Sequence, residues 1–167
     1  MGNTIENLQA AFAGESQASR KYLYFAEQAD REGQPQIAKL FRAASEAETV
    51  HARKHLKVLN GIGTTDANLK AAISGEYHEM TEMYPDFIAK AKAEKNSTAE
   101  AAFNLANQVE RVHHGLYHQA LADLQAGKKL TAKAYYVCQV CGHTAEGEPP
   151  EKCPVCGAIR AMYKKID

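Results

Sequence analysis

The chain has 167 residues, with 20 Lys and Arg against 20 Asp and Glu, and therefore no net formal charge. Its basic residues are dispersed and form no block interleaved with aromatic residues, which argues against nucleic-acid binding. No apolar run approaches the ~18 residues that span a bilayer, and no secretory signal opens the sequence. We therefore expect a cytoplasmic protein that binds neither nucleic acid nor membrane, with one core and a small appendage.

The first third of the sequence predicts two helices. The first covers residues 3–33, where Asn3 and Glu6 have the spacing of a capping box and a glycine ends the helix. The second covers residues 35–60, because Pro35 suits a first helical turn and Asn-Gly ends the segment.

Two more helices are expected after a crossover at residues 61–65. The third covers residues 66–95, and Pro85 is expected to kink it by removing one backbone donor. The fourth covers residues 97–127 and is expected to open with a capping box at Ser97.

A Glu-x-x-His motif occurs twice, once in the second helix and once in the fourth. Glu48 and His51 are repeated 62 positions later as Glu110 and His113. A helix turns every 3.6 residues, so the carboxylate and the imidazole of each copy point the same way, one turn apart. Each copy therefore has the form of half a metal site.

The duplication extends beyond this motif. Residues 6–15 return as residues 67–76 at an offset of 61 positions, so one residue is gained between this repeat and the Glu-x-x-His repeat. The repeat places a single carboxylate, Glu15 or Glu76, on the other helix of each half. Four helices carrying this set have the ligand arrangement of carboxylate-bridged di-iron bundles.

Burying four carboxylates requires compensation, because each costs several kcal/mol without a partner. Two divalent cations would supply it, and this mixture of oxygen and imidazole ligands suits iron or manganese better than zinc or copper. Glu79 lies one turn beyond Glu76 and has Ala18 as its counterpart in the first half. This seventh candidate ligand adds negative charge on one side of the site, which favours the more oxidised metal pair. It therefore indicates a redox function and not iron storage.

The composition changes after residue 127. Residues 1–127 are predicted to form the helical bundle, 128–134 a linker, and 135–167 a small domain that depends on a metal for its stability. Two Cys-x-x-Cys pairs supply the ligands, and a glycine of positive φ is expected after each pair. From the spacing alone, a zinc ribbon and an iron site remain equally open. The four ligands are Cys138, Cys141, Cys153 and Cys156.

The paired Glu-x-x-His motifs, the run Gly75-Glu76-Tyr77-His78-Glu79 and the cysteine pairs together resemble the rubrerythrin family over essentially the whole length. The resemblance implies a mainly α fold, with a ferritin-like four-helix bundle and a C-terminal rubredoxin-like domain. It also implies two non-haem irons in the bundle and one iron in the four-cysteine site. Tyr136 and the run Cys-Pro-Val-Cys-Gly resemble rubredoxin, with a shorter loop between the cysteine pairs.

The same resemblance implies a role for each ligand of the bundle. Glu48 and Glu110 would bridge both irons, while Glu15 and Glu76 would be terminal ligands. His113 would bind the iron near Glu76.

Two further roles come from the resemblance. One iron would exchange His51 for Glu79 as the pair is oxidised, which makes these two residues the catalytic candidates. Tyr22 and Tyr84 match tyrosines that hydrogen-bond the ligand carboxylates, although on sequence alone tyrosines at such positions are more often core aromatics.

The expected function is a peroxidase that reduces hydrogen peroxide to water and protects against oxidative stress. Its electrons would come from a reduced nicotinamide nucleotide through a reductase or rubredoxin. Because the reach of a tail within one chain is uncertain, we expect a head-to-tail homodimer in which each tail serves the partner's di-iron site. The alternatives are ferritin-like iron storage and a regulatory module with a colourless zinc tail.

Overall fold

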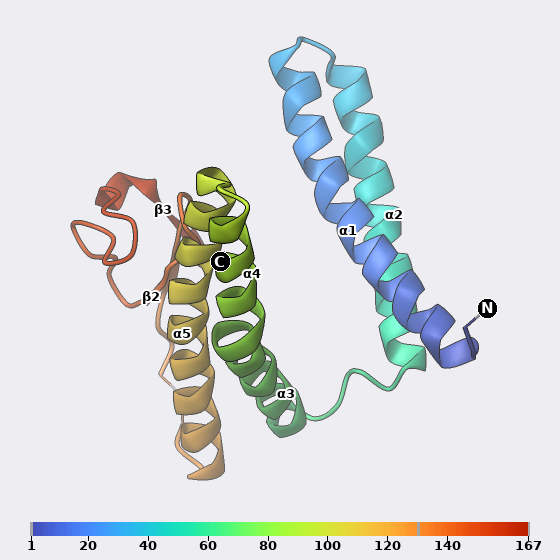
Figure 1. The fold of residues 1–167 in the computed structure, drawn as a ribbon. Coiled ribbons are helices and arrows are strands. Elements are labelled where there is room, and N and C mark those ends of the chain that lie inside the picture. The colour runs from blue at the N-terminus through green and yellow to red at the C-terminus, as the bar shows by residue number, and fades with distance from the viewer. Residues whose placement is uncertain (1, 130, 167) are drawn as a thin grey trace. The chain divides into compact units, whose positions relative to one another are not determined.

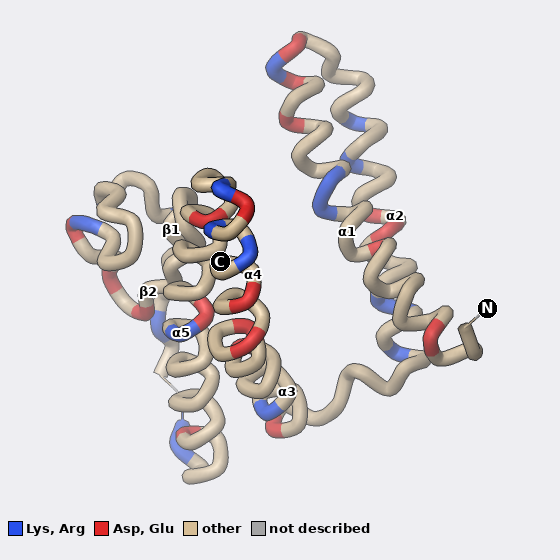
Figure 2. Tube along the Cα trace, in the orientation of Figure 1, with Lys and Arg blue, Asp and Glu red and all other residues tan. Residues whose placement is uncertain are grey.

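The computed structural model describes residues 2–129 and 131–166. Leu130, within the expected linker, lies outside the described residues. The chain divides into two compact units, Met1–Gly63 and Thr64–Asp167, and each is described by itself. Acidic and basic residues are interspersed along both units (Figure 2). Within the described residues, no helix is both long and apolar enough to cross a membrane.

The first unit is a hairpin of two long helices, α1 (Thr4–Arg31) and α2 (Pro35–Val58), which lie side by side (Figure 1). The predicted capping box at the start of α1 is confirmed. The Asn3 side chain accepts from the backbone N–H of Glu6, and the Glu6 side chain accepts from the backbone N–H of Asn3. Pro35 opens α2, as expected.

The second unit begins with a helix that is interrupted. It consists of α3 (Thr65–His78), a π-helical turn at Glu79–Met83 and α4 (Tyr84–Ala93), all packed along α5 (Ser97–Gln125). The backbone N–H of Tyr84 bonds to the carbonyl of Glu79, five residues back. The sequence predicted one helix kinked at Pro85, and the structure instead has a π turn just before this proline.

The π turn accounts for the change in repeat offset that the sequence shows. The first residues of α1 and α3 are 61 positions apart, whereas the last residues of α1 and α4 are 62 apart. A π turn accommodates one extra residue within a helix. The residue gained in the second half therefore lies at Glu79–Met83. This is the same turn that holds Glu79, the carboxylate without a counterpart in the first half.

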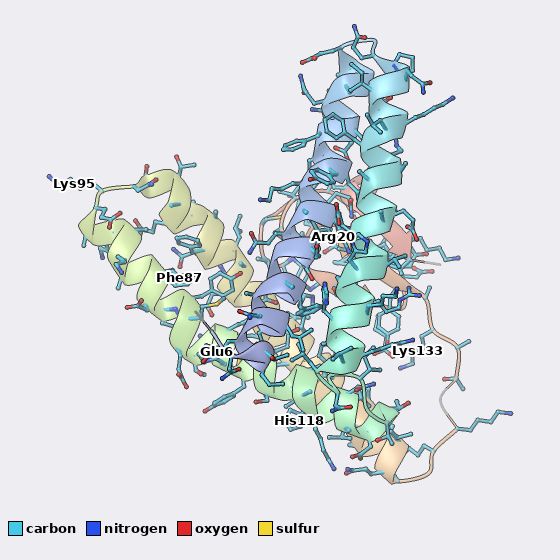
Figure 3. The ribbon with its side chains drawn as sticks, turned by 90° about the vertical axis from the view of Figure 1, so that its right-hand side faces the viewer. Glu6, Arg20, Phe87, Lys95, His118 and Lys133 are labelled. Carbon is cyan, nitrogen blue, oxygen red and sulfur yellow. The ribbon has the colours of Figure 1, made fainter. Side chains whose placement is uncertain are left out.

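The two halves also share an aromatic cluster that the sequence analysis did not single out. In the hairpin, the rings of Phe25 and Phe41 lie 5.5 Å apart between centroids. The rings of Phe87 and Phe103, 62 positions later, have the same 5.5 Å separation, and Phe87 faces α5 (Figure 3). Both units therefore repeat one packing arrangement, not only one ligand pattern.

The N-terminal cap of α5 differs from the expected one. Asn96 is the cap, and its side chain accepts from the backbone N–H of Ala99. Lys95 has a positive φ of 58°, which turns the chain so that Asn96 precedes the first turn. Ser97 is therefore the first helical residue, and the predicted capping box at this position is wrong.

The C-terminal part of the second unit is a small three-stranded sheet. Its strands are β1 (Tyr135–Cys138), β2 (Thr144–Glu146) and β3 (Tyr163–Ile166), in the order β2-β1-β3. The central strand β1 is antiparallel to both neighbours. Strand β2 contacts α5, so the sheet lies against the helix that carries the second Glu-x-x-His motif.

Candidate metal centres

The first ligand group lies within the hairpin. Glu15 on α1 and Glu48 and His51 on α2 each offer a ligand atom within 4.8 Å of the others. His51 Nδ1 is 3.0 Å from Glu48 Oε2. A buried hydrogen bond of 2.8 Å from the Ser45 hydroxyl to the Ser19 carbonyl joins the two helices one turn away. The contact between the two carboxylates raises the pKa of Glu15 and lowers that of Glu48.

The second group is the repeat of the first, in the second unit. Glu76 on α3 and Glu110 and His113 on α5 also place ligand atoms within 4.8 Å of one another. His113 Nδ1 lies 2.8 Å from Glu110 Oε2 and 3.8 Å from Glu76 Oε2. The side chains of Glu76 and Glu110 are only 17% and 15% exposed. The structure thus gathers six of the seven predicted bundle ligands, all except Glu79, into two trios of the same composition.

The electrostatics of the second trio call for a cation. Burial, followed by the neighbouring carboxylates of Glu110 and Glu79, raises the pKa of Glu76 to about 7. Its Oε2 atom is buried and has no hydrogen-bond partner among the described residues. A buried acceptor of this kind is costly unless a donor or a metal satisfies it. These residues therefore fit a divalent metal.

Glu79 and the two tyrosines lie outside the trios. Glu79 opens the π turn and is half-buried, and burial and the charge of Glu110 raise its pKa. Burial, followed by the charges of the carboxylates Glu110, Glu79 and Glu76, raises the pKa of Tyr84. Tyr22 packs against Phe25 and Phe41. The roles of Glu79, Tyr22 and Tyr84 at the metals stay predictions.

The four cysteines form a third group in the tail. Cys138 and Cys156 have their sulfur atoms 3.7 Å apart, and Cys141 and Cys153 have theirs 3.5 Å apart. Four sulfurs around one ion at ~2.3 Å are separated by about 3.7 Å in a tetrahedron, so the arrangement fits one metal. The glycines after each pair have φ of +87° and +75°, which confirms the predicted positive φ.

One of these thiols is favoured as a thiolate. Burial raises the pKa of Cys153, but hydrogen bonds from the Tyr163 hydroxyl and from backbone N–H groups outweigh it and bring the pKa to about 6. The Tyr163 hydroxyl also lies 2.8 Å from His143 Nδ1. Burial raises the pKa of Cys141 instead, so Cys153 is the thiol most ready to bind a cation and Cys141 would ionise on binding it.

A hydrogen bond links the tail to the second trio. His113 Nε2 is 2.9 Å from the Thr144 hydroxyl, which lies 3.4 Å from the carbonyl of Gly142, next to Cys141. If this hydroxyl donates to the carbonyl, it accepts from Nε2–H of His113. The imidazole then has its Nδ1 lone pair free on the side of the carboxylates, where a ligating histidine would bind the metal.

Sequence reasoning missed Thr144, because a threonine three residues after a cysteine carries no signal of its own. The contact also places the tail beside a ligand of its own chain, a question that the sequence left open. Gly127, with φ of 64°, ends α5, and strand β2 is packed back against that helix. The distance within one chain therefore does not by itself require the tail to serve a partner's site, and the head-to-tail homodimer stays a prediction.

The two carboxylate-histidine trios on paired helices and the four-cysteine sheet define the class as a helical carboxylate-metal protein with a rubredoxin-like domain. The Rubrerythrin family model matches residues 6–121, and the rubredoxin-like domain model of rubrerythrin matches residues 136–164. The chain belongs to the rubrerythrin family.

Individual relatives agree with the family models over most of their length. The chain is 34% identical to rubrerythrin-2 of Clostridium acetobutylicum, over 96% of this chain and 95% of the relative. It is 37% identical to nigerythrin of Nitratidesulfovibrio vulgaris, over 93% of this chain and 83% of that protein. A solved structure of nigerythrin in its fully reduced, all-ferrous state matches with a TM-score of 0.60 at 34% identity, covering 99% of this chain and 88% of that one.

The predicted fold class and cofactors are confirmed. The fold is mainly α, with the helices of a ferritin-like bundle and a C-terminal rubredoxin-like domain. The cofactors are the irons of a carboxylate di-iron site and of a four-cysteine site, and the residues present fit both. The family is one of oxidoreductases.

Proposed function

We propose that this protein reduces hydrogen peroxide to water and so protects against oxidative stress. Electrons arrive one at a time at the four-cysteine site from a reductase or rubredoxin, with a reduced nicotinamide nucleotide as the ultimate donor. The observation that carries the proposal is the His113–Thr144 hydrogen bond of 2.9 Å, which joins a ligand of the bundle to the cysteine domain. Iron storage needs no such link, and neither does a regulatory zinc ribbon.

The proposed reaction balances as H₂O₂ + 2 e⁻ + 2 H⁺ → 2 H₂O. When bound, the iron pair supplies two electrons together, and the four-cysteine iron passes single electrons with little ligand movement. His113 keeps its proton on Nε2, against Thr144, and so holds Nδ1 toward the carboxylates. Glu76 and Glu110 supply negative charge in a largely water-excluded site, which favours the oxidised metals.

Glu79 is the proposed exchangeable ligand, taking the place of His51 on oxidation. Its position supports this role, because it opens the π turn, and such turns occur frequently at functional sites. The ring of His113 is held through Nε2 by Thr144, whereas the Nδ1 atom of His51 contacts Glu48.

We further propose a functional division into a bundle at residues 1–127, a linker at 128–134 and an electron-transfer domain at 135–167. The match of the rubredoxin-like model to residues 136–164 supports the last of these bounds. The cysteine domain is also the proposed docking point for the external electron donor.

A single-turnover experiment tests the proposed function. The iron-loaded protein is reduced without oxygen, given less than one equivalent of hydrogen peroxide, and followed through the visible absorption of the four-cysteine centre. We expect fast reoxidation of this centre, with two electrons withdrawn from the protein for each peroxide. Reoxidation no faster than in a free rubredoxin would contradict the proposal. A closed multi-subunit shell filling with iron would favour storage, and a colourless tail would favour the zinc module.

A further inference from the structure

We propose that His143 and Tyr163 form a hydrogen-bond chain that raises the reduction potential of the four-cysteine iron, with Tyr163 donating to the sulfur of Cys153. Both are positioning residues, because they act on the metal through one of its ligands. The inference goes beyond the proposed function, since it concerns how readily the tail accepts an electron and holds whichever oxidant the bundle reduces.

The backbone of β1 places both side chains next to the cysteines. Cys138, the last residue of β1, is paired with Tyr163, the first residue of β3. Toward β2, the backbone N–H of Cys138 donates to the carbonyl of His143 at 2.9 Å. The two rings therefore meet beside the first cysteine pair, with their centroids 6.0 Å apart and their planes at 87°.

The two contacts of the Tyr163 hydroxyl fix the direction of the chain. This hydroxyl lies 2.8 Å from His143 Nδ1 and is also hydrogen-bonded to the Cys153 sulfur. A sulfur bound to a metal carries no hydrogen, so the single hydrogen of the phenol must point to it. A neutral imidazole can carry its proton on Nδ1 and donate it to the phenol oxygen. Both contacts are satisfied only in the order His143 N–H to Tyr163 O–H to Cys153 sulfur.

The chain lies away from water, which strengthens both of its hydrogen bonds. His143 is only 9% exposed, and Tyr163 is half-buried. Where the local dielectric constant is low, successive hydrogen bonds polarise one another. The imidazole N–H therefore makes the Tyr163 hydroxyl a stronger donor to the sulfur than a phenol alone would be.

A hydrogen bond to a ligand sulfur favours the reduced iron. Reduction adds one electron and one negative charge to the four-thiolate centre, and the phenol keeps its proton in both states. Hydrogen bonds to charged acceptors are the stronger ones, so the bond to Cys153 gains strength on reduction. Hydrogen bonds to the sulfurs are among the factors that set the potential of such iron sites. The tail therefore accepts an electron readily and stays reduced until the bundle is oxidised.

The side-chain origin of this donor makes it testable. The Cys153 sulfur also accepts from the backbone N–H groups of Val155 and Cys156, which no substitution of a side chain removes. The Tyr163 hydroxyl, by contrast, is removed by one change that keeps the ring. It can therefore be separated from the rest of the environment of the sulfur.

A spectroelectrochemical titration of the iron-loaded, full-length protein tests the proposal. In Tyr163→Phe we expect the equilibrium constant for reduction of the four-cysteine iron to fall about tenfold, a shift of about 59 mV for one electron. His143→Phe should lower the potential by less, because the hydroxyl remains without its donor. Tyr135→Phe is the matched control and should leave the potential unchanged, since it removes a phenol hydroxyl from a residue of the same sheet that is 41% exposed.

Two results would overturn the proposal. One is an unchanged potential in Tyr163→Phe with the absorption spectrum of the four-cysteine iron intact. The other is a raised potential in His143→Phe, because the hydroxyl would then donate to the imidazole in the wild type and reach the sulfur only without it.

The wild type gives an answer even if a variant fails to bind iron. With an NMR-active cadmium isotope in the four-cysteine site, scalar coupling between the metal and the Tyr163 hydroxyl proton would support the proposal. Coupling of this proton to Nδ1 of His143 would contradict it. None of these measurements uses peroxide turnover, so a protein with the expected potentials that fails to reduce peroxide would overturn only the proposed function.

Discussion

Replacing Thr144 by valine removes the hydroxyl that joins the two metal centres while keeping the shape of the side chain. In the structure this hydroxyl lies 2.9 Å from His113 Nε2 and 3.4 Å from the Gly142 carbonyl. Thr144→Val therefore leaves the imidazole N–H without its partner and frees the ring to rotate or to change tautomer. The ligating Nδ1 atom then loses its fixed direction toward Glu76 and Glu110.

The size of the effect follows from the burial of His113. Leaving a buried donor unsatisfied costs about 1–3 kcal/mol, and the 27% exposure of this side chain places the cost toward the lower end. At ~1.4 kcal/mol for each factor of ten, this is a loss of about 5- to 20-fold in metal affinity. Removing the hydrogen-bond partner of a ligating histidine typically costs 10- to 100-fold, which overlaps this range.

Two measurements check this prediction. Competition with a chelator gives the affinity of the bundle for ferrous iron, and single-turnover kinetics give the rate at which peroxide reoxidises the four-cysteine centre. Both should fall in Thr144→Val and recover in Thr144→Ser, which keeps the hydroxyl, while the absorption of the four-cysteine centre stays unchanged in all three proteins. If valine matches the wild type in affinity and in rate, the hydrogen bond neither orients His113 nor couples the centres.

Three other substitutions separate the remaining steps. Glu79→Ala should slow peroxide turnover while the absorption of the tail persists; undiminished turnover would exclude ligand exchange at this residue. Cys141→Ser should abolish the visible colour of the tail and the supply of electrons, yet leave helical circular dichroism intact, and retained turnover with a reductase would contradict the relay. Glu76→Gln should change the pH dependence of stability in the metal-free chain. The folded pKa of about 7 lies above the ordinary 4.5, so the folded chain binds more protons between these values, and its free energy of unfolding should fall as pH rises from about 4.5 to 7, by at most about 3 kcal/mol. Urea unfolding should show this decline in the wild type and a weaker one in Glu76→Gln. If the free energy of unfolding falls equally with pH in both, Glu76 is not the group with the raised pKa.

The ligand chemistry of this protein was readable from its sequence because it depends on local spacing. Glu48 with His51 and Glu110 with His113 face one way simply because an α-helix turns every 3.6 residues. The two Cys-x-x-Cys pairs are also defined by local spacing, and the positive φ of Gly142 and Gly157 follows from the tight turns after them. The change of repeat offset from 61 to 62 even signalled an added residue, although its form as a π turn did not follow from the count.

Other features were decided only by the tertiary structure. The contact of Thr144 with His113 spans 31 positions, and no periodicity relates a residue in a strand to one on a distant helix. The helix cap at Asn96, one residue before the predicted Ser97, depends on the backbone turn at Lys95. Spacing within a helix is set by covalent geometry and hydrogen bonding over a few residues. The meeting of tail and bundle is set by how the whole chain packs, which local sequence does not encode.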